Sequence, residues 1–256
     1  MPNYRIGITE AGDAGLEFVW VEKLRTLDGA VLITKDCNSD FRAAVATNDR
    51  GNIIVHATIT GHGGTVIEPG VPSSKTQTEN IAQLIRHGFP IERIVVRIDP
   101  IIPTASGIKT AYRAMRSCMA LGIRRFRVSV LDAYPHVRER FHKCGIEPPY
   151  GEAFSASDDQ FHEVDKMLHA CKCLSAGLTG EKQIRIECCA EPKLAVPSHS
   201  GCISDYDLSL MGLEPEGDGF SGHQRKDCLC YSGKVELLGC KKPCSHNCLY
   251  CYWRGV

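Results

Sequence analysis

The chain has 256 residues, enough for one large domain, and its 43% hydrophobic and 23% charged residues are typical of a folded globular protein. Thirty basic and thirty acidic side chains give a net charge of zero, which excludes binding to nucleic acid by overall charge alone. Every apolar run is shorter than a membrane span, and residues 1–12 lack the build of a signal peptide, so we expect a cytoplasmic protein without membrane partners.

Strands and helices are expected to alternate through residues 1–191, the first of two expected domains. Short β-type runs predict strands, and apolar residues at helical spacing predict the helices between them. The expected strands cover 4–9, 30–34, 52–60, 93–98, 126–131 and 183–189. The expected helices cover 16–27, 75–86, 108–119 and 157–174, and Ser157 with Gln160 forms a capping box at the start of the last one.

This alternation predicts an α/β fold with a parallel sheet. We favour a partial or complete TIM-like (βα) barrel, including a circularly permuted form, over an open doubly wound sheet. The reason is that polar residues recur where the strands end, and barrel enzymes assemble their sites at this rim. The polar rim residues are Glu10, Lys35, Asp36, Thr60, Asp99, Asp132 and Glu191.

Residues 192–256 form the second expected domain, a loop-rich tail packed on the barrel mouth. Prolines and glycines interrupt its apolar pattern, and nine of the fourteen cysteines lie between Cys188 and Cys251. A secreted disulfide scaffold spreads its cysteines through a small domain, whereas here a cysteine-poor body precedes a cysteine-dense tail. We therefore expect metal ligation to order the tail.

The strongest motif is Cys244-Ser-His-Asn-Cys248-Leu-Tyr-Cys251, with the spacing C-x3-C-x2-C. Three thiolates on one tight loop suit a [4Fe–4S] cluster that keeps one iron open for a further ligand. The alternative is a structural zinc site with Cys240 or His246 as its fourth ligand.

The triad spacing, with Tyr250 before the last cysteine, resembles the signature of the radical S-adenosylmethionine (SAM) superfamily. From about residue 52 onward the chain also resembles a domain family of unknown function with a C-terminal cluster of this type, related in pattern to spore photoproduct lyase. The matching blocks, in the family's order, are 58–63, 68–72, 97–102, 189–191, 201–203, 224–230 and the terminal triad.

The resemblance implies that the cluster cleaves SAM to a 5′-deoxyadenosyl radical, which abstracts a substrate hydrogen in an isomerase or lyase reaction. Tyr250 would then lie against the adenine. An electron donor such as flavodoxin or ferredoxin is expected, and a nucleobase in DNA is the leading substrate, with a small metabolite or amino-acid derivative as the alternative. A non-catalytic binding module stabilised by zinc or a cluster is the alternative from another class.

Two stretches depart from the family pattern, residues 9–13 and 237–239, so substrate identity is not transferred. The position of the motif at the end of the chain has two explanations. Residues 234–238 would form the strand that precedes the cysteines, which makes the barrel circularly permuted, or else the tail only folds over the barrel mouth.

Rim residues are the candidates for catalysis and for SAM binding. Glu191, Arg97 and Asp99 are expected to act in catalysis, with carboxylates for the SAM amine and Arg97 for its carboxylate. Thr60 and Gly61 begin a glycine-rich segment that would approach the nucleoside, unless it is a plain tight turn. We expect no ion pair between Arg97 and Asp99, because residues two apart on a strand lie about 7 Å apart. The basic clusters are either solvated faces or phosphate contacts, and they comprise Arg124, Arg125, Arg127, Arg138 and Arg140.

A second cysteine set is expected to hold an auxiliary cluster, with zinc or free thiols as alternatives. It comprises Cys189, Cys202, Cys228 and Cys230, with Cys188 and Cys240 in reserve. Four thiolates saturate a cubane cluster, which then relays electrons or stabilises the fold. The C-x-C of this set is cramped for one zinc ion. Cys118, Cys171 and Cys173 lie on helix stripes and are expected to be core residues.

Overall fold

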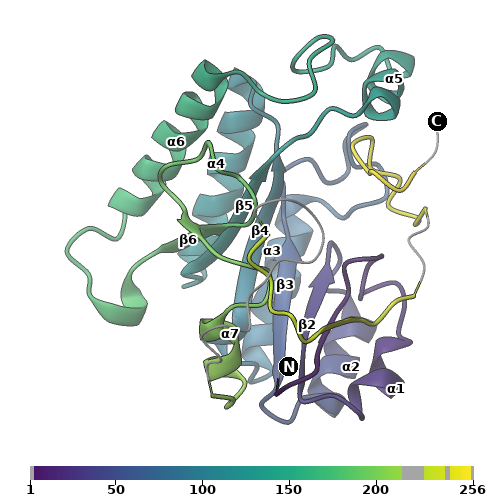
Figure 1. Cartoon of the computed structure of the whole chain (residues 1–256), viewed down its shortest axis with the longest axis vertical. Helices are drawn as coiled ribbons and strands as arrows, with labels where there is room; N and C mark the ends of the chain where they lie inside the picture. Colours follow the sequence, from purple (N-terminus) through teal and green to yellow (C-terminus); the bar gives the residue numbers. More distant parts are fainter. Residues whose placement is uncertain (1–2, 215–227, 240–242, 255–256) are drawn as a thin grey trace.

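The computed structural model of the chain describes residues 3–214, 228–239 and 243–254. Their strands form one sheet in which every neighbouring pair runs parallel (Figure 1). The strands are β1 (Ile6–Ile8), β2 (Gly29–Thr34), β3 (Ile53–Thr58), β4 (Ile94–Ile101), β5 (Arg125–Val130), β6 (Arg185–Cys188), β7 (Ser198–His199) and β8 (Lys234–Glu236). They lie in the order β7-β6-β5-β4-β3-β2-β1-β8, and between the edge strands β7 and β8 no pairing closes a barrel in the described residues.

The strands expected from the sequence correspond to β1 to β6. The helices are α1 (Trp20–Leu24), α2 (Ser39–Asn48), α3 (Ser74–Arg86), α4 (Ala105–Ala120), α5 (Pro135–Lys143), α6 (Asp158–Cys173) and α7 (Asp205–Leu210), with short 3₁₀ turns η1 (Ile91–Arg93) and η2 (Gly180–Lys182). The capping box of Ser157 and Gln160 is confirmed at the start of α6. Three helices were not predicted, α2, α5 and α7. The first of these buries only Phe41 and Val45, so its sequence carries a weak helical pattern.

The two faces of the sheet differ in what covers them. One apolar cluster packs α1, α2, α3, α4 and α6 against the outer face, and neighbouring residues such as Val31 and Leu32 point to opposite faces. Cys118 and Cys171 lie in this core, as predicted. Cys173 is exposed, contrary to expectation, because residues two apart on a helix do not share a face.

The opposite face, which we call the inner face, changes character along the strands. Near the strand starts it is apolar, and α7 with the fully buried Tyr231 covers it. Further along, its side chains are polar, and Arg127 lies 3.2 Å from Asp207 of α7 and 3.5 Å from Glu187. Asp207 also pairs with Arg125 at 2.6 Å. A buried layer of charge thus separates the apolar base from the carboxyl ends of the strands.

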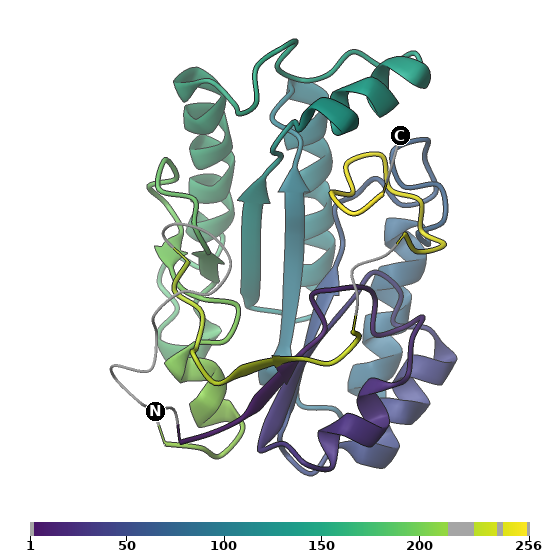
Figure 2. The same cartoon turned by 45° about the vertical axis from the view of Figure 1, so that its right-hand side comes forward.

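The segment after residue 191 contributes both edges of the sheet. β8 pairs in parallel with β1, beside which it lies in Figure 2, so the predicted strand before the cysteine motif is confirmed. The backbone N–H of Leu237 donates to the carbonyl of Ile8 at 2.8 Å, and Lys234 forms an ion pair with Glu10 at 2.9 Å. The tail was expected to be rich in loops, and β7 and α7 also lie in it. Its backbone joins a sheet made by the rest of the chain.

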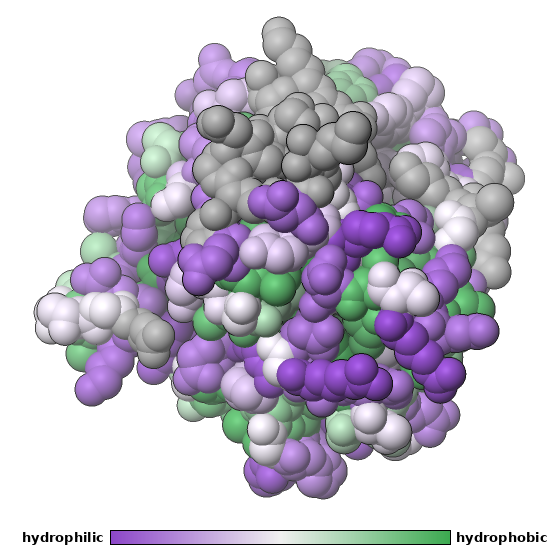
Figure 3. Space-filling view, turned by 60° about the horizontal axis from the view of Figure 1, so that its bottom comes forward, coloured by the Kyte–Doolittle hydropathy of each residue, from purple (hydrophilic) through white to green (hydrophobic). Residues whose placement is uncertain are grey.

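The face of the molecule drawn in Figure 3 carries polar and apolar side chains together. Seen partly from below, it is a mosaic of hydrophilic side chains with hydrophobic ones between them (Figure 3). Among the described residues, no helix combines the length and apolar character that crossing a bilayer requires.

Candidate functional site

A cavity of about 670 Å³ lies at the carboxyl ends of the strands. This volume is in the range of small-molecule sites. The wall combines inner-face side chains with both cysteine-rich segments, and it contains most of the predicted rim residues. Rim residues on the wall are Glu10, Lys35, Asp99, Asp132 and Glu191. The site is therefore where parallel α/β enzymes place their chemistry.

The C-terminal triad lies on a loop that we call the cysteine loop, residues 243–254. Cys244, Cys248 and Cys251 all line the cavity. Burial raises the pKa of Cys248 to about 12, and the other two thiols add to this effect. In the described residues, the three sulfur atoms of the triad do not form a group in which all lie within 4.8 Å of one another. The second cysteine set, described below, does form such a group. The three thiols therefore face one space without converging on one point.

The backbone of the cysteine loop is held by residues far away in the sequence. Arg140 of α5 donates to the carbonyls of Leu249 at 2.8 Å and of Cys251 at 2.5 Å, and it also bonds the carbonyl of Arg254. On the other side, Gly70 approaches so closely that a Cβ atom there would lie 2.2 Å from the carbonyl oxygen of Ser245. A glycine is required where two backbones come this close.

A histidine inside the motif fixes the loop to the first strand–helix connection. His246 is buried, with Nε2 2.8 Å from Oδ2 of Asp13 and Nδ1 3.1 Å from the carbonyl oxygen of Gly70. Burial alone would lower the pKa of His246, but Asp13 raises it above its usual value. His246 is therefore engaged with the protein rather than free to act as a fourth ligand beside the triad.

Tyr250 belongs to a buried polar group beneath the cysteine loop. Its hydroxyl bonds Glu68 and accepts from Lys35 Nζ at 2.7 Å, and Lys35 also pairs with Glu68 at 2.9 Å. Burial works to lower the pKa of Lys35, but Glu68 and Cys248 raise it above its usual value. A cation is thus held beside the most buried thiol of the triad.

The three predicted catalytic residues, Arg97, Asp99 and Glu191, all line the cavity. Contrary to expectation, Arg97 forms an ion pair with Asp99, because the arginine side chain is long enough to bend back to a carboxylate on its own strand. Asp99 also accepts from Ser129, and Arg97 with Ser129 holds the pKa of Asp99 below its usual range although burial opposes this. Glu191 is buried, and its Oε1 accepts from the N–H of Val130 at 3.3 Å.

Thr60 and Gly61 lie elsewhere. The Thr60 hydroxyl donates to Glu68 at 2.7 Å, and Gly61 has a φ of 93° and packs against Thr110 of α4. Neither residue is among those that line the cavity. The glycine-rich segment is therefore a tight turn that supports Glu68.

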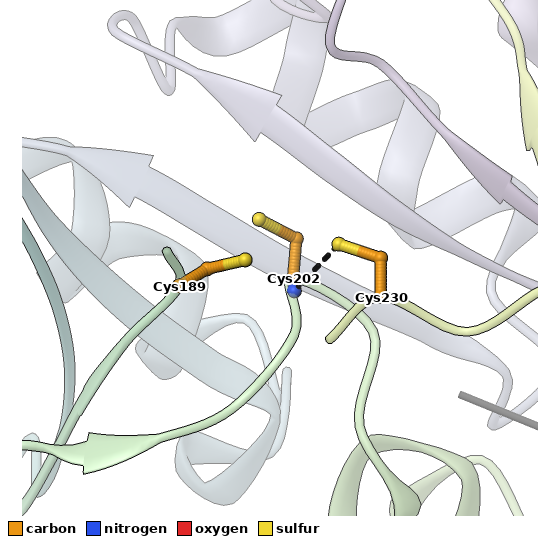
Figure 4. A group of neighbouring side chains, drawn as sticks. All are labelled: Cys189, Cys202 and Cys230. Carbon is orange, nitrogen blue, oxygen red and sulfur yellow. Dashed lines mark hydrogen bonds between the residues drawn. The ribbon is translucent and has the colours of Figure 1, made fainter. Parts of the chain in front are cut away.

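Three of the four cysteines of the second set point toward one another (Figure 4). The sulfur atoms of Cys189, Cys202 and Cys230 lie within 4.8 Å of one another, and Cys228 Sγ lies 3.7 Å from Cys189 Sγ. We call these four residues the four-cysteine site. Hydrogen bonds from Cys189 and Cys230, together with Arg97, lower the pKa of Cys202 well below its usual value. Cys189, Cys202 and Cys230 are close enough to hold a metal ion between them.

The reserve cysteines do not join either set in the described residues. Cys188 is the last residue of β6 and is buried in the core on the outer face of the sheet, whereas Cys189 follows the strand and lines the cavity. Cys240 lies outside the described residues, as do Gln224 and Arg225 of the family block.

Sequence reasoning did not assign a role to several side chains around the cavity. Lys234 and Asp13 were missed, since their partners Glu10 and His246 lie more than two hundred residues away in the sequence. Lys35 and Glu10 were singled out only as rim residues, and their place at strand ends was the available signal.

A search among curated proteins found no match. A family model described as a domain of unknown function (DUF1848) matches residues 19–253 and so covers most of the chain, including both cysteine sets. The protein belongs to the DUF1848 family.

Proposed function

We propose that the protein is a radical SAM enzyme whose [4Fe–4S] cluster is bound by Cys244, Cys248 and Cys251. The observation that carries the proposal is that the three thiols of one C-x3-C-x2-C motif line a single cavity at the carboxyl ends of the strands. In a cubane each thiolate binds a different iron, so the sulfur atoms stand farther apart than ligands of a single ion. A fourth thiol would not be needed, since the remaining iron would be left for SAM.

The fold supports the same proposal when it is read as a circularly permuted partial barrel. The crossover helices cover one face of the parallel sheet, and the cavity opens at the carboxyl ends of the strands on the other. In the radical SAM superfamily the cysteine motif follows the first barrel strand. Here β8 lies at the edge of the sheet beside β1 and leads into the cysteine loop, so it takes the place of that first strand.

A cluster bound by these residues and reduced would supply the one electron needed to break a carbon–sulfur bond of SAM, which gives methionine and a radical able to take a hydrogen atom from the substrate. The residues of the chain bind and orient the reactants. Lys35, Arg97 and Lys234 place positive charge on the cavity wall, where each pairs with a carboxylate of the chain and the SAM carboxylate would compete for it. Glu191 and Asp99 offer carboxylates for its amine. The Glu68 and Lys35 contacts hold Tyr250 in one orientation beside the motif.

We further propose that the substrate is a small polar molecule rather than DNA. The basic residues considered for phosphate contacts are engaged within the fold. Arg125 and Arg127 are buried against Asp207, and Arg140 is buried against the cysteine loop. A small charged metabolite or amino-acid derivative fits a cavity of about 670 Å³ with charged walls.

The experiment is an anaerobic assay of the iron-reconstituted protein with dithionite and SAM, in which 5′-deoxyadenosine and methionine are measured by mass spectrometry. We expect the wild type to form both, and Cys248→Ala to form neither while retaining its far-ultraviolet circular dichroism. The control is Cys144→Ser, because Cys144 is an exposed thiol of the loop after α5. SAM cleavage by Cys248→Ala at the wild-type rate, or a wild type that binds no iron, would overturn the assignment.

A further inference from the structure

We propose that the four-cysteine site binds a single tetrahedral metal ion of the zinc class, separate from the cluster of the cysteine loop. Sequence spacing had favoured an auxiliary iron–sulfur cluster here. The positions of the sulfur atoms favour one ion instead, and this inference does not depend on the proposed activity.

The distances between sulfur atoms carry the argument. A zinc–thiolate bond is about 2.3 Å, so two thiolates on one tetrahedral ion lie about 3.8 Å apart. Cys189 Sγ and Cys228 Sγ are 3.7 Å apart, and the Cys189, Cys202 and Cys230 sulfurs all lie within 4.8 Å of one another. In a cubane the thiolates would bind four separate irons and be spread more widely. Cys189, Cys202 and Cys230 therefore have the spacing of ligands that share one centre. Cys228 lies outside this group of three, so its thiol, 3.7 Å from that of Cys189, would have to turn toward the ion to supply the fourth ligand despite the cramped C-x-C spacing.

Two backbone segments that carry these thiols, at Gly201 and at Leu229–Cys230, lie in direct contact. A Cβ atom at Gly201 would lie 2.3 Å from the carbonyl oxygen of Leu229 and 2.6 Å from Cys230 Cα, so only glycine allows these two segments to touch. The next residue, Cys202, donates its backbone N–H to Cys230 Sγ at 3.2 Å. Such a bond to a ligand sulfur orients the ligand and stabilises its thiolate form.

The surrounding charge also suits thiolates on a dication. Four thiolates and one divalent ion carry two net negative charges, and Arg97 Nη1 lies 3.7 Å from Cys202 Sγ. Arg127 lies on the same face of the sheet and donates to the carbonyl of Ser200 at 3.2 Å, two residues from Cys202. Two guanidinium groups thus adjoin one side of the site.

The ligands come from three separate segments of the chain. Cys189 follows β6, Cys202 follows β7, and Cys228 with Cys230 precedes β8. An ion at this position links the end of β6 to the segment that leads into β8, the strand before the cysteine loop. The ion therefore has a structural role, which is to hold β8 in position.

The test is metal analysis of protein made in medium that contains both iron and zinc and purified without oxygen. We expect one zinc per chain in the wild type, and an X-ray absorption spectrum at the zinc edge that fits four sulfur ligands at about 2.3 Å. Cys230→Ser and Cys202→Ser should lose the zinc. Cys248→Ala and the control Cys144→Ser should keep it.

The outcomes separate this inference from the proposed activity. Zinc that persists in Cys248→Ala supports the four-cysteine site even if the protein never cleaves SAM. A wild type without zinc overturns the inference, as does one with about eight irons that loses half of them in Cys230→Ser. Oxygen or nitrogen ligands at the zinc edge also overturn it, and this measurement on the wild type stands if the serine variants do not fold.

Discussion

The cysteine loop carries three thiols within eight consecutive residues, whereas the four-cysteine site draws its thiols from three segments between residues 189 and 230. Both sets reach the wall of the same cavity. In the cysteine loop, neighbours in sequence are held apart in space, and Arg140 and Gly70 anchor the loop through its backbone. In the four-cysteine site, the sulfurs of Cys189, Cys202 and Cys230, which are distant in sequence, converge to within 4.8 Å of one another.

The difference shows that cysteine spacing in a sequence and sulfur spacing in a fold carry separate information. A short motif limits how far apart its thiols can lie, but not whether they share one ion. Convergence of distant segments brings sulfurs to the separation of ligands on a single centre. The same residue type, on one cavity wall, therefore serves two kinds of metal centre in our proposals.

Removing the charged layer beneath the four-cysteine site should have the largest effect on stability. Asp207 is fully buried between Arg125 and Arg127, so Asp207→Ala leaves two buried cations without their partner. We expect a loss of about 3–5 kcal/mol in the free energy of unfolding, measured by urea titration at pH 7. A loss below 1 kcal/mol would show that this layer does not support the site.

The same residue gives the stability a pH dependence of known sign. Burial opposes ionisation of Asp207, but the two arginines lower its pKa from 3.8 to about 2. Its contribution is complete above pH 4 and is lost as the pH falls through 2. The stability difference between the wild type and Asp207→Ala should therefore narrow over that range, whereas a constant difference would contradict the ion-pair explanation.

Loosening the cysteine loop should have a smaller and more local effect. Arg140→Ala removes charge-assisted hydrogen bonds to three loop carbonyls, and we expect a cost of about 2–3 kcal/mol. Hydrogen exchange should accelerate in residues 243–254, and the iron content should fall while zinc stays bound. The matched control is Arg138→Ala on the same helix, whose guanidinium bonds Ala133 and Glu152 instead. Equal effects of both variants would contradict a specific anchor.

Two glycine variants, one beside each cysteine site, test whether the two sites bind their metals independently. Gly70→Ala forces a methyl group against Ser245 of the cysteine loop, and Gly201→Ala forces one against Leu229 and Cys230. We expect each to cost about 1–3 kcal/mol. In metal analysis the first should lower iron and the second zinc. If either variant lowers both metals equally, the two sites are not independent.

The smallest effect is expected at the Tyr250 hydroxyl. Tyr250→Phe removes its bonds to Glu68 and Lys35, which remain paired with each other, so we expect a loss of about 1 kcal/mol in unfolding experiments. Iron content should not change. Tyr112→Phe on α4 serves as the control, and a loss of iron in Tyr250→Phe alone would give the hydroxyl a larger role than we assign.

Local patterns predicted much of the fold. β1 to β6 follow from short β-type runs, and α6 begins at its predicted capping box. The short helix α7 was missed, because its six residues make too short a pattern to stand out among glycines and prolines. The prediction that Arg97 and Asp99 form no ion pair was wrong. Backbone spacing alone does not account for the reach of the arginine side chain.

The sequence by itself determined the alternation of strands and helices, the polar residues at the strand ends and the three-cysteine motif. These features depend on residues close together in the chain, whose spacing limits what they can form. Only the tertiary structure decided that β8 joins β1, that His246 meets Asp13 and that the sulfurs of Cys189, Cys202 and Cys230 converge. Such contacts join segments far apart in the chain, and their distances follow from how the whole sheet and its connections pack.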